Sequence, residues 1–133
     1  MERDVFDNKK EWFGMEQRTT LLSALNLADS LFHRRDCSVE FNSLLREALP
    51  HARALGPEDD TYLGLRALQA QAVTDDAAAS LDDVAEAVTI LEDISNISRR
   101  VMGPTHPLSK LRAHNLAIAQ RKLARRRARA SPA

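Results

Sequence analysis

A short motif that contains glycine occurs three times in this chain of 133 residues, and this repeat constrains the fold more than any other feature. Intervals of 42 and 47 residues separate Gly14, Gly56 and Gly103, and in each copy an alanine stands fourteen positions after the glycine. A period of this size is typical of stacked helical units, each too small to bury its own apolar face. We therefore look for function along a stacked surface.

The spacing of apolar residues predicts helices throughout. Apolar residues recur at intervals of three and four along five segments, which is the pattern of amphipathic helices. The chain has only four glycines and five prolines, and most of them fall between these segments. The sequence therefore predicts an all-α fold, a short α-solenoid of antiparallel helix pairs. The predicted helices cover about residues 17–35, 38–55, 58–73, 81–102 and 107–124.

One repeat domain is expected to cover residues 14–124. A polar arm or short helix, residues 1–13, precedes this domain and packs on it through Trp12 and Phe13. A basic tail, residues 125–133, follows it and is expected to fray because nothing apolar requires it to stay helical. The links between repeat copies are expected at residue 14, at residues 56–57 and at residues 103–107.

Side chains near the helix ends predict where helices begin. Ser80 or Asp82 can cap the fourth helix, and His106 is expected to cap or brace the turn before the fifth. Pro107 suits the first turn of the fifth helix because its missing N–H needs no partner there. Apolar stripes are expected to face the core. These stripes include Leu22 in the first helix, Leu81 and Val101 in the fourth, and Leu111 in the fifth.

Opposite charges are segregated along the chain, although the net charge is zero. No lysine or arginine lies between Arg66 and Arg99, an interval that holds seven acidic residues. Ten basic residues follow Asp93, and no acidic residue does. The sequence therefore predicts an acidic segment, residues 75–93, followed by a basic end.

Signals of membrane insertion, secretion and catalysis are absent from the sequence. No apolar run reaches the ~20 residues that span a bilayer, and the first residues lack a signal-peptide core. A single cysteine agrees with a reducing compartment, so we expect a soluble, cytoplasmic protein. No two histidines stand four residues apart, and no phosphate-binding glycine loop or nucleophile elbow occurs. We therefore expect no enzyme, no cofactor and no metal site.

Three features occur together in the repeat: a glycine-proline link with a His-Pro pair, an Asn-Leu-Ala helix, and an Ala-Leu pair in the partner helix. In these features the chain resembles the tetratricopeptide repeat family, and within it the repeat of about 42 residues found in kinesin light chains. The middle copy departs from the pattern, because Asp59-Asp60 replaces His-Pro and Leu68 replaces asparagine. The matching residues are Gly14, Thr20, Leu21, Asn26, Leu27 and Ala28; Ala48, Leu49, Leu55, Gly56 and Pro57; and Gly103, Pro104, His106, Pro107, Asn115, Leu116 and Ala117.

The resemblance implies a scaffold that binds a peptide or partner protein in a concave groove lined by the first helix of each pair. Asn26 and Asn115 would then point into the groove; the alternative is that they only tie neighbouring helices together. Family members that grip a carboxylate tail place a basic residue one turn earlier, where this chain has Leu22, Gly64 and Leu111. The resemblance therefore argues against that ligand. The groove candidates are Asn26, Asp29, His33, Gln71, Asp75, Asn115 and Lys122.

The basic end supports a second hypothesis, the binding of nucleic acid or of an acidic partner surface. Arginine suits phosphate, but no aromatic residue is interleaved with the arginines to stack on bases. The alternatives are a solvated terminal helix and self-association with the acidic segment of another copy. The basic candidates are Arg121, Lys122, Arg125, Arg126, Arg127 and Arg129.

Overall fold

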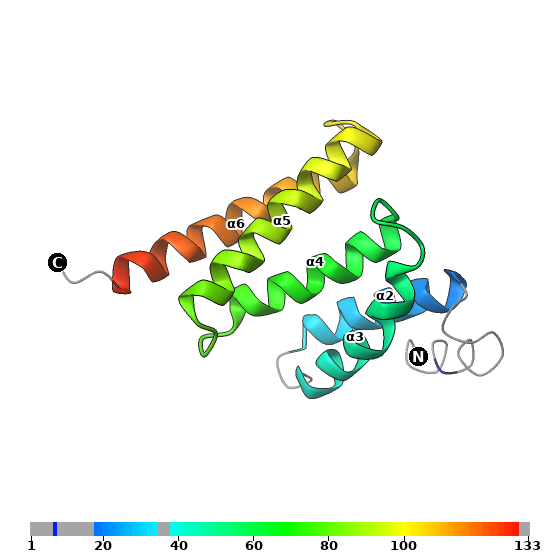
Figure 1. Cartoon of the computed structure of the whole chain (residues 1–133), viewed down its shortest axis with the longest axis horizontal. Helices are drawn as coiled ribbons and strands as arrows, with labels where there is room; N and C mark the ends of the chain where they lie inside the picture. Colours follow the sequence, from blue (N-terminus) through cyan, green and yellow to red (C-terminus); the bar gives the residue numbers. More distant parts are fainter. Residues whose placement is uncertain (1–6, 8–17, 35–37, 131–133) are drawn as a thin grey trace. The chain divides into compact units, whose positions relative to one another are not determined.

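The computed structural model describes residues 7, 18–34 and 38–130, and its regular structure is α-helical (Figure 1). No strand occurs in these ranges. The all-α prediction with about five helices is therefore confirmed. The link at Gly14 and the arm of residues 1–13, apart from Asp7, lie outside the described residues. The helices are α2 (Arg18–Phe32), α3 (Ser38–Arg53), α4 (Asp60–Asp75), α5 (Leu81–Met102) and α6 (Pro107–Ala130).

The chain divides into two compact units, Met1–Gln69 and Ala70–Ala133, and the boundary lies inside α4. The first unit holds α2, α3 and the beginning of α4. The second holds the end of α4 together with α5 and α6. Buried residues of α4 fall on two opposite faces of the helix, because Leu65 and Leu68 lie about half a turn away from Leu63.

In the first unit, α2 and α3 pack side by side along their apolar stripes. Leu21, Ala24 and Ala28 of α2 are fully buried, and α3 contributes Leu44, Leu45 and Ala48 in the same way. The rings of Phe32 and Phe41 close the pair at one end, with centroids 5.8 Å apart. Leu22 was expected on this stripe but is 46% exposed, because the neighbouring positions Leu21 and Leu25 face inward instead.

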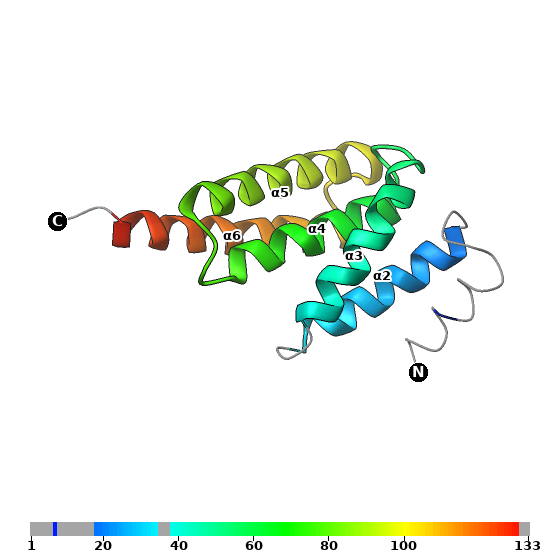
Figure 2. The same ribbon diagram turned by 60° about the horizontal axis from the view of Figure 1, so that its bottom comes forward.

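In the second unit, α5 and α6 run antiparallel beside each other (Figure 2). The stripe predicted for α5 is buried along its middle, from Val84 to Ile94. Leu81 and Val101 were expected on the same stripe, but they are exposed because they lie in the first and last turns of the helix, where few neighbours cover them.

The face of α6 that packs on α5 is partly polar. Ser109 Oγ donates a 3.1 Å hydrogen bond to the Ser98 carbonyl, and Arg112 Nη1 donates one of 2.7 Å to Ser98 Oγ. Ser98 Oγ in turn donates to the Ile94 carbonyl. Since Ser109 and Arg112 take the inward positions, Leu111 is turned outward and is 51% exposed, contrary to expectation. These bonds fix the register of the hairpin.

Two of the repeated links share two backbone features. Gly56 and Gly103 both adopt positive φ, 116° and 87°. In each link the N–H three residues later donates back to the glycine carbonyl, at 3.2 Å from Asp59 and 3.4 Å from His106. A positive φ favours glycine, which has no Cβ to clash. The glycine of the repeat is therefore required by the turn itself.

The residue three positions after each glycine caps the next helix. Asp59 Oδ1 accepts the backbone N–H groups of Thr61 and Tyr62 at the start of α4. His106 Nδ1 accepts the N–H of Leu108, at 3.1 Å, at the start of α6. Asp59 therefore replaces His106 with the same function, and the capping role expected for His106 is confirmed. Ser80 caps α5 by accepting the N–H of Asp83, also as expected.

The C-terminal boundary differs from expectation, because α6 continues through Ala130. Residues 125–130 are helical, so the end predicted at residue 124 falls inside the helix. Without acidic residues after Asp93, the basic side chains of this stretch suit the C-terminal end of a helix dipole. Residues 131–133 lie outside the described part.

Replacing Gly103 by alanine tests the link. With φ 87° and ψ 156°, Gly103 occupies a region that other residues rarely adopt, although a Cβ there would meet no neighbour. We expect Gly103→Ala to lower the free energy of unfolding by about 1–3 kcal/mol. Urea denaturation followed by circular dichroism measures this loss, with Thr105→Ala in the same exposed turn as the control. Equal stability of the two variants would contradict the strain argument.

Replacing His106 tests its equivalence to Asp59. His106→Ala removes the acceptor and should cost about 1 kcal/mol of unfolding free energy. His106→Asp should keep the cap and be at least as stable as the natural chain, because a carboxylate also favours a helix N-terminus. Urea denaturation near neutral pH compares the three proteins. An aspartate variant as unstable as the alanine variant would show that the two links are not interchangeable.

Candidate functional site

The first three groove candidates lie along α2 on its exposed side. Asn26, Asp29 and His33 are separated by three and four residues, which places them on one stripe, and all three are exposed. His33 Nδ1 donates a 2.7 Å hydrogen bond to the Asp29 carbonyl, and the same nitrogen lies 3.8 Å from Asp29 Oδ1. The structure therefore brings Asp29 and His33 together at the end of α2 and leaves the Asn26 amide open to solvent.

The middle copy offers no amide at the equivalent position. Leu68 stands there and is only 7% exposed, so it belongs to the core. Gln71, one turn later on α4, is half-buried. This copy therefore differs from the other two in surface chemistry, although its link at Gly56 folds like the one at Gly103.

On α6 the candidates are Asn115, which is half-buried, and Lys122. Lys122 Nζ donates to Asp75 Oδ1 at the end of α4 and forms an ion pair with it. Two groove candidates are thus brought together, and they neutralise each other. Asn26, Asp29 and His33 belong to the first compact unit, whereas Gln71, Asp75, Asn115 and Lys122 belong to the second.

The ion pair between α4 and α6 joins residues separated by the interval of the repeat. Lys122 is 47 residues from Asp75, and the same interval separates Gly56 from Gly103. Arg126 Nη1 donates a 2.9 Å hydrogen bond to the carbonyl of Ala79, in the turn after α4. The Asp75–Lys122 pair therefore joins equivalent positions of two successive copies.

Arg126 anchors the end of α6 to the last turn of α4 and to the turn that follows it. Besides Ala79, its guanidinium donates to the carbonyls of Asp76 and Thr74. Carbonyls at a helix C-terminus lack partners within the helix, so a planar group with five donors suits them well. Arg126 and Lys122, both predicted for a basic binding surface, are therefore engaged within the chain.

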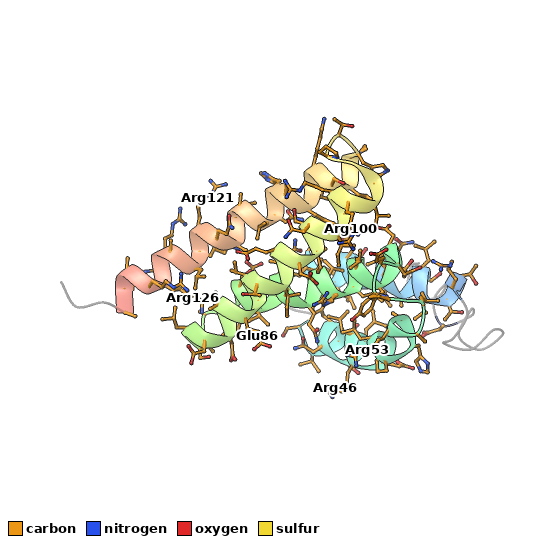
Figure 3. All side chains as sticks on the ribbon, turned by 45° about the horizontal axis from the view of Figure 1, so that its top comes forward. Arg46, Arg53, Glu86, Arg100, Arg121 and Arg126 are labelled. Atoms are coloured by element: carbon orange, nitrogen blue, oxygen red, sulfur yellow. The ribbon has the colours of Figure 1, made fainter. Side chains whose placement is uncertain are left out.

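The other basic candidates remain on the surface. Arg121, Arg125, Arg127 and Arg129 are exposed, and Arg121 Nε donates only to the carbonyl of Ala117 one turn earlier. Figure 3 shows the side chains of Arg121 and Arg126 leaving opposite sides of α6. The basic candidates on α6 therefore fall into two groups, those bonded to other parts of the chain and those exposed on the surface.

In the first unit, α2 and α4 meet where the chain has a glycine. A Cβ placed on Gly64 would lie 3.0 Å from Leu25 Cδ2, so the leucine side chain fills the space that a larger residue would need. Arg18 at the start of α2 also forms an ion pair with Asp59, whose side chain is 7% exposed. The two helices therefore touch at two places, at Asp59, which caps α4, and at Gly64 within α4.

Among the described residues, no group of three or more His, Cys, Asp and Glu side chains is placed to hold a metal ion. None of the described helices combines the length and apolarity needed to cross a membrane. No family model matches the chain, and no curated protein or solved structure matches it significantly.

Truncation of Arg126 tests its anchoring role. Arg126→Ala leaves carbonyls at the end of α4 without their charged donor, and we expect it to lower the free energy of unfolding by about 1–2 kcal/mol. Its neighbour Arg125 is exposed, so Arg125→Ala should change stability by less than about 0.5 kcal/mol. Urea denaturation compares the two variants, which have the same charge. Equal losses would show that Arg126 contributes no more than a solvated arginine.

Proposed function

We propose that the chain is a protein–protein interaction module without catalytic activity, built as a short tetratricopeptide-like stack of the kinesin-light-chain type. In this proposal α2, α4 and α6 are the first helices of successive copies, and α3 and α5 are their partner helices. The first helices line a concave groove that holds a peptide or a segment of a partner protein. The module acts in the cytoplasm.

The observation that carries the proposal is the register between α4 and α6. Lys122 of α6 pairs with Asp75 of α4, which stands 47 residues earlier, and 47 is also the interval between the two equivalent links. Such pairing is expected when the first helices of two copies lie side by side without an axial shift, as in a solenoid. A bundle without repeats has no reason to couple its contacts to the interval of a sequence pattern.

Two further observations support the stack. Leu25 of α2 packs on Gly64 of α4, so these first helices also touch. Burial on two opposite faces of α4 suits the middle helix of such an arrangement, which has neighbours on both sides.

Amide side chains are the best candidates for peptide contact. Asn26 is exposed, Asn115 and Gln71 are half-buried, and each amide can both donate and accept a hydrogen bond. An amide can therefore pair with the carbonyl and the N–H of a peptide backbone without selecting its sequence. Asp75 and Lys122 satisfy each other, so they contribute less to a ligand.

Peptide binding tests the proposal directly. An array of short peptides of varied sequence is probed with the purified full chain, and the best binder is titrated by fluorescence anisotropy. We expect Asn26→Ala and Asn115→Ala each to weaken binding about tenfold, the value of one or two lost hydrogen bonds. Asn42→Ala on the exposed side of α3, a partner helix, is the control and should bind as the natural chain does.

Binding that both asparagine changes leave intact would reject the groove. If only Asn26→Ala weakens the complex, the site is confined to the first unit. Circular dichroism of each variant confirms that the helices are retained, so a loss of binding reports the lost amide.

A further inference from the structure

The exposed side of α6 carries a line of arginines. Arg121, Arg125 and Arg129 are spaced four residues apart and all are exposed, so they form one row along the helix, the arginine stripe. Successive members are about 6 Å apart along the axis. The basic residues that anchor α6 point elsewhere, as Arg112, Lys122 and Arg126 show by their bonds within the chain.

The exposed side of α5 carries the opposite charge with matching spacing. Asp82 and Glu86 are four residues apart, which keeps both on one face, the acidic stripe. Both side chains are exposed. Their spacing along the helix equals that between successive members of the arginine stripe.

The two stripes do not neutralise each other within the molecule. Asp82 and Glu86 form no ion pair with any residue that the structure describes. The same holds for Arg125 and Arg129 within the described ranges. In Figure 3, Arg121 and Glu86 point away from each other at opposite edges of the α5–α6 pair. Each stripe therefore presents its charge to the solvent.

We infer that the arginine stripe of one molecule binds the acidic stripe of a second copy of this chain. Opposite charges at the same spacing can pair along two helices, and arginine holds carboxylates in a bidentate way. Because the stripes lie on opposite edges, the contact is head to tail and leaves one stripe free at each end. Exposed ion pairs are individually weak, so the association depends on concentration and on salt.

A second copy fits these observations better than nucleic acid does. Nucleic acid would use the arginine stripe alone and leave the acidic stripe unmatched, and α6 contains no aromatic residue on which a base could stack. The zero net charge also gives the chain no overall attraction for a long polyanion. A copy of the chain satisfies both stripes at once.

Sedimentation equilibrium of the full chain tests the inference. The average mass should exceed that of the 14.8 kDa monomer at low ionic strength. It should return to the monomer value at about 1 M salt, where the Debye length has fallen to about 3 Å. A mass that is the same at both ionic strengths overturns the inference.

Charge reversal identifies the two faces. Arg125→Glu with Arg129→Glu reverses one stripe, and Asp82→Arg with Glu86→Arg reverses the other. Each double variant should associate at least about tenfold more weakly than the natural chain, since two attractive pairs become repulsive. Arg46→Glu with Arg53→Glu makes the same charge change at exposed positions of α3 and should leave association intact.

Mixing the two double variants gives the decisive result. Each double variant has two stripes of like charge, whereas every stripe of one variant is complementary to the facing stripe of the other, so the mixture should associate with the two variants alternating. The variant with all four changes should associate with itself again, because its stripes are reversed but still complementary. A mixture that remains monomeric rejects the contact, provided that circular dichroism shows both variants folded.

A short DNA duplex provides the competing outcome. Retention of the duplex by the natural chain, lost in the variant with Arg125→Glu and Arg129→Glu, without any self-association at low salt, would assign the arginine stripe to nucleic acid and overturn the inference.

Discussion

The backbone turn at Gly56 and Gly103 is the constraint on which the rest of the structure depends. Each glycine adopts a positive φ, lies between two helices, and stands three residues before the next cap. The two caps differ in chemistry, a carboxylate at Asp59 and an imidazole at His106, yet both satisfy the first N–H groups of a helix. The turn therefore requires an acceptor at this position and not a particular residue. This explains how the middle copy can lose its His-Pro pair and keep its geometry.

Because the links at Gly56 and Gly103 are equivalent, residues of the two helices that follow them, α4 and α6, can be compared position by position. Helices α4 and α6 start in the same way, so residues at equal distances from their caps are equivalent in the two copies. The contact of Lys122 with Asp75 occurs at such equivalent positions. It is charged and lies at the end of α4, whereas Leu123 and Ala119 of α6 are buried. Apolar burial therefore holds the helices together, and the charged contact fixes their register.

Apolar periodicity is enough to predict the helices, most of their bounds and two of their caps, because these depend on residues close in sequence. It fails for α6, where an inward Arg112 replaces the expected Leu111. An arginine is buried only when partners satisfy its donors, and those partners are on α5, which no local pattern reveals. Asn26 lies on the exposed side of α2. The pairing of Asp75 with Lys122 could not be predicted, because it depends on how two distant helices lie against each other.

The division of the basic residues shows most clearly what the structure adds. In a frayed tail, the positive charges of residues 125–133 would have no fixed positions, and every arginine would be equivalent. As a helix through Ala130, the same residues project in different directions every 100° or so, and neighbours acquire different environments. Arg126 turns towards the carbonyls that end α4, while Arg125 faces solvent. Neighbouring arginines of one charged segment therefore differ: Arg126 anchors the helix, and the exposed arginines form the stripe that we infer binds an acidic stripe on a second copy.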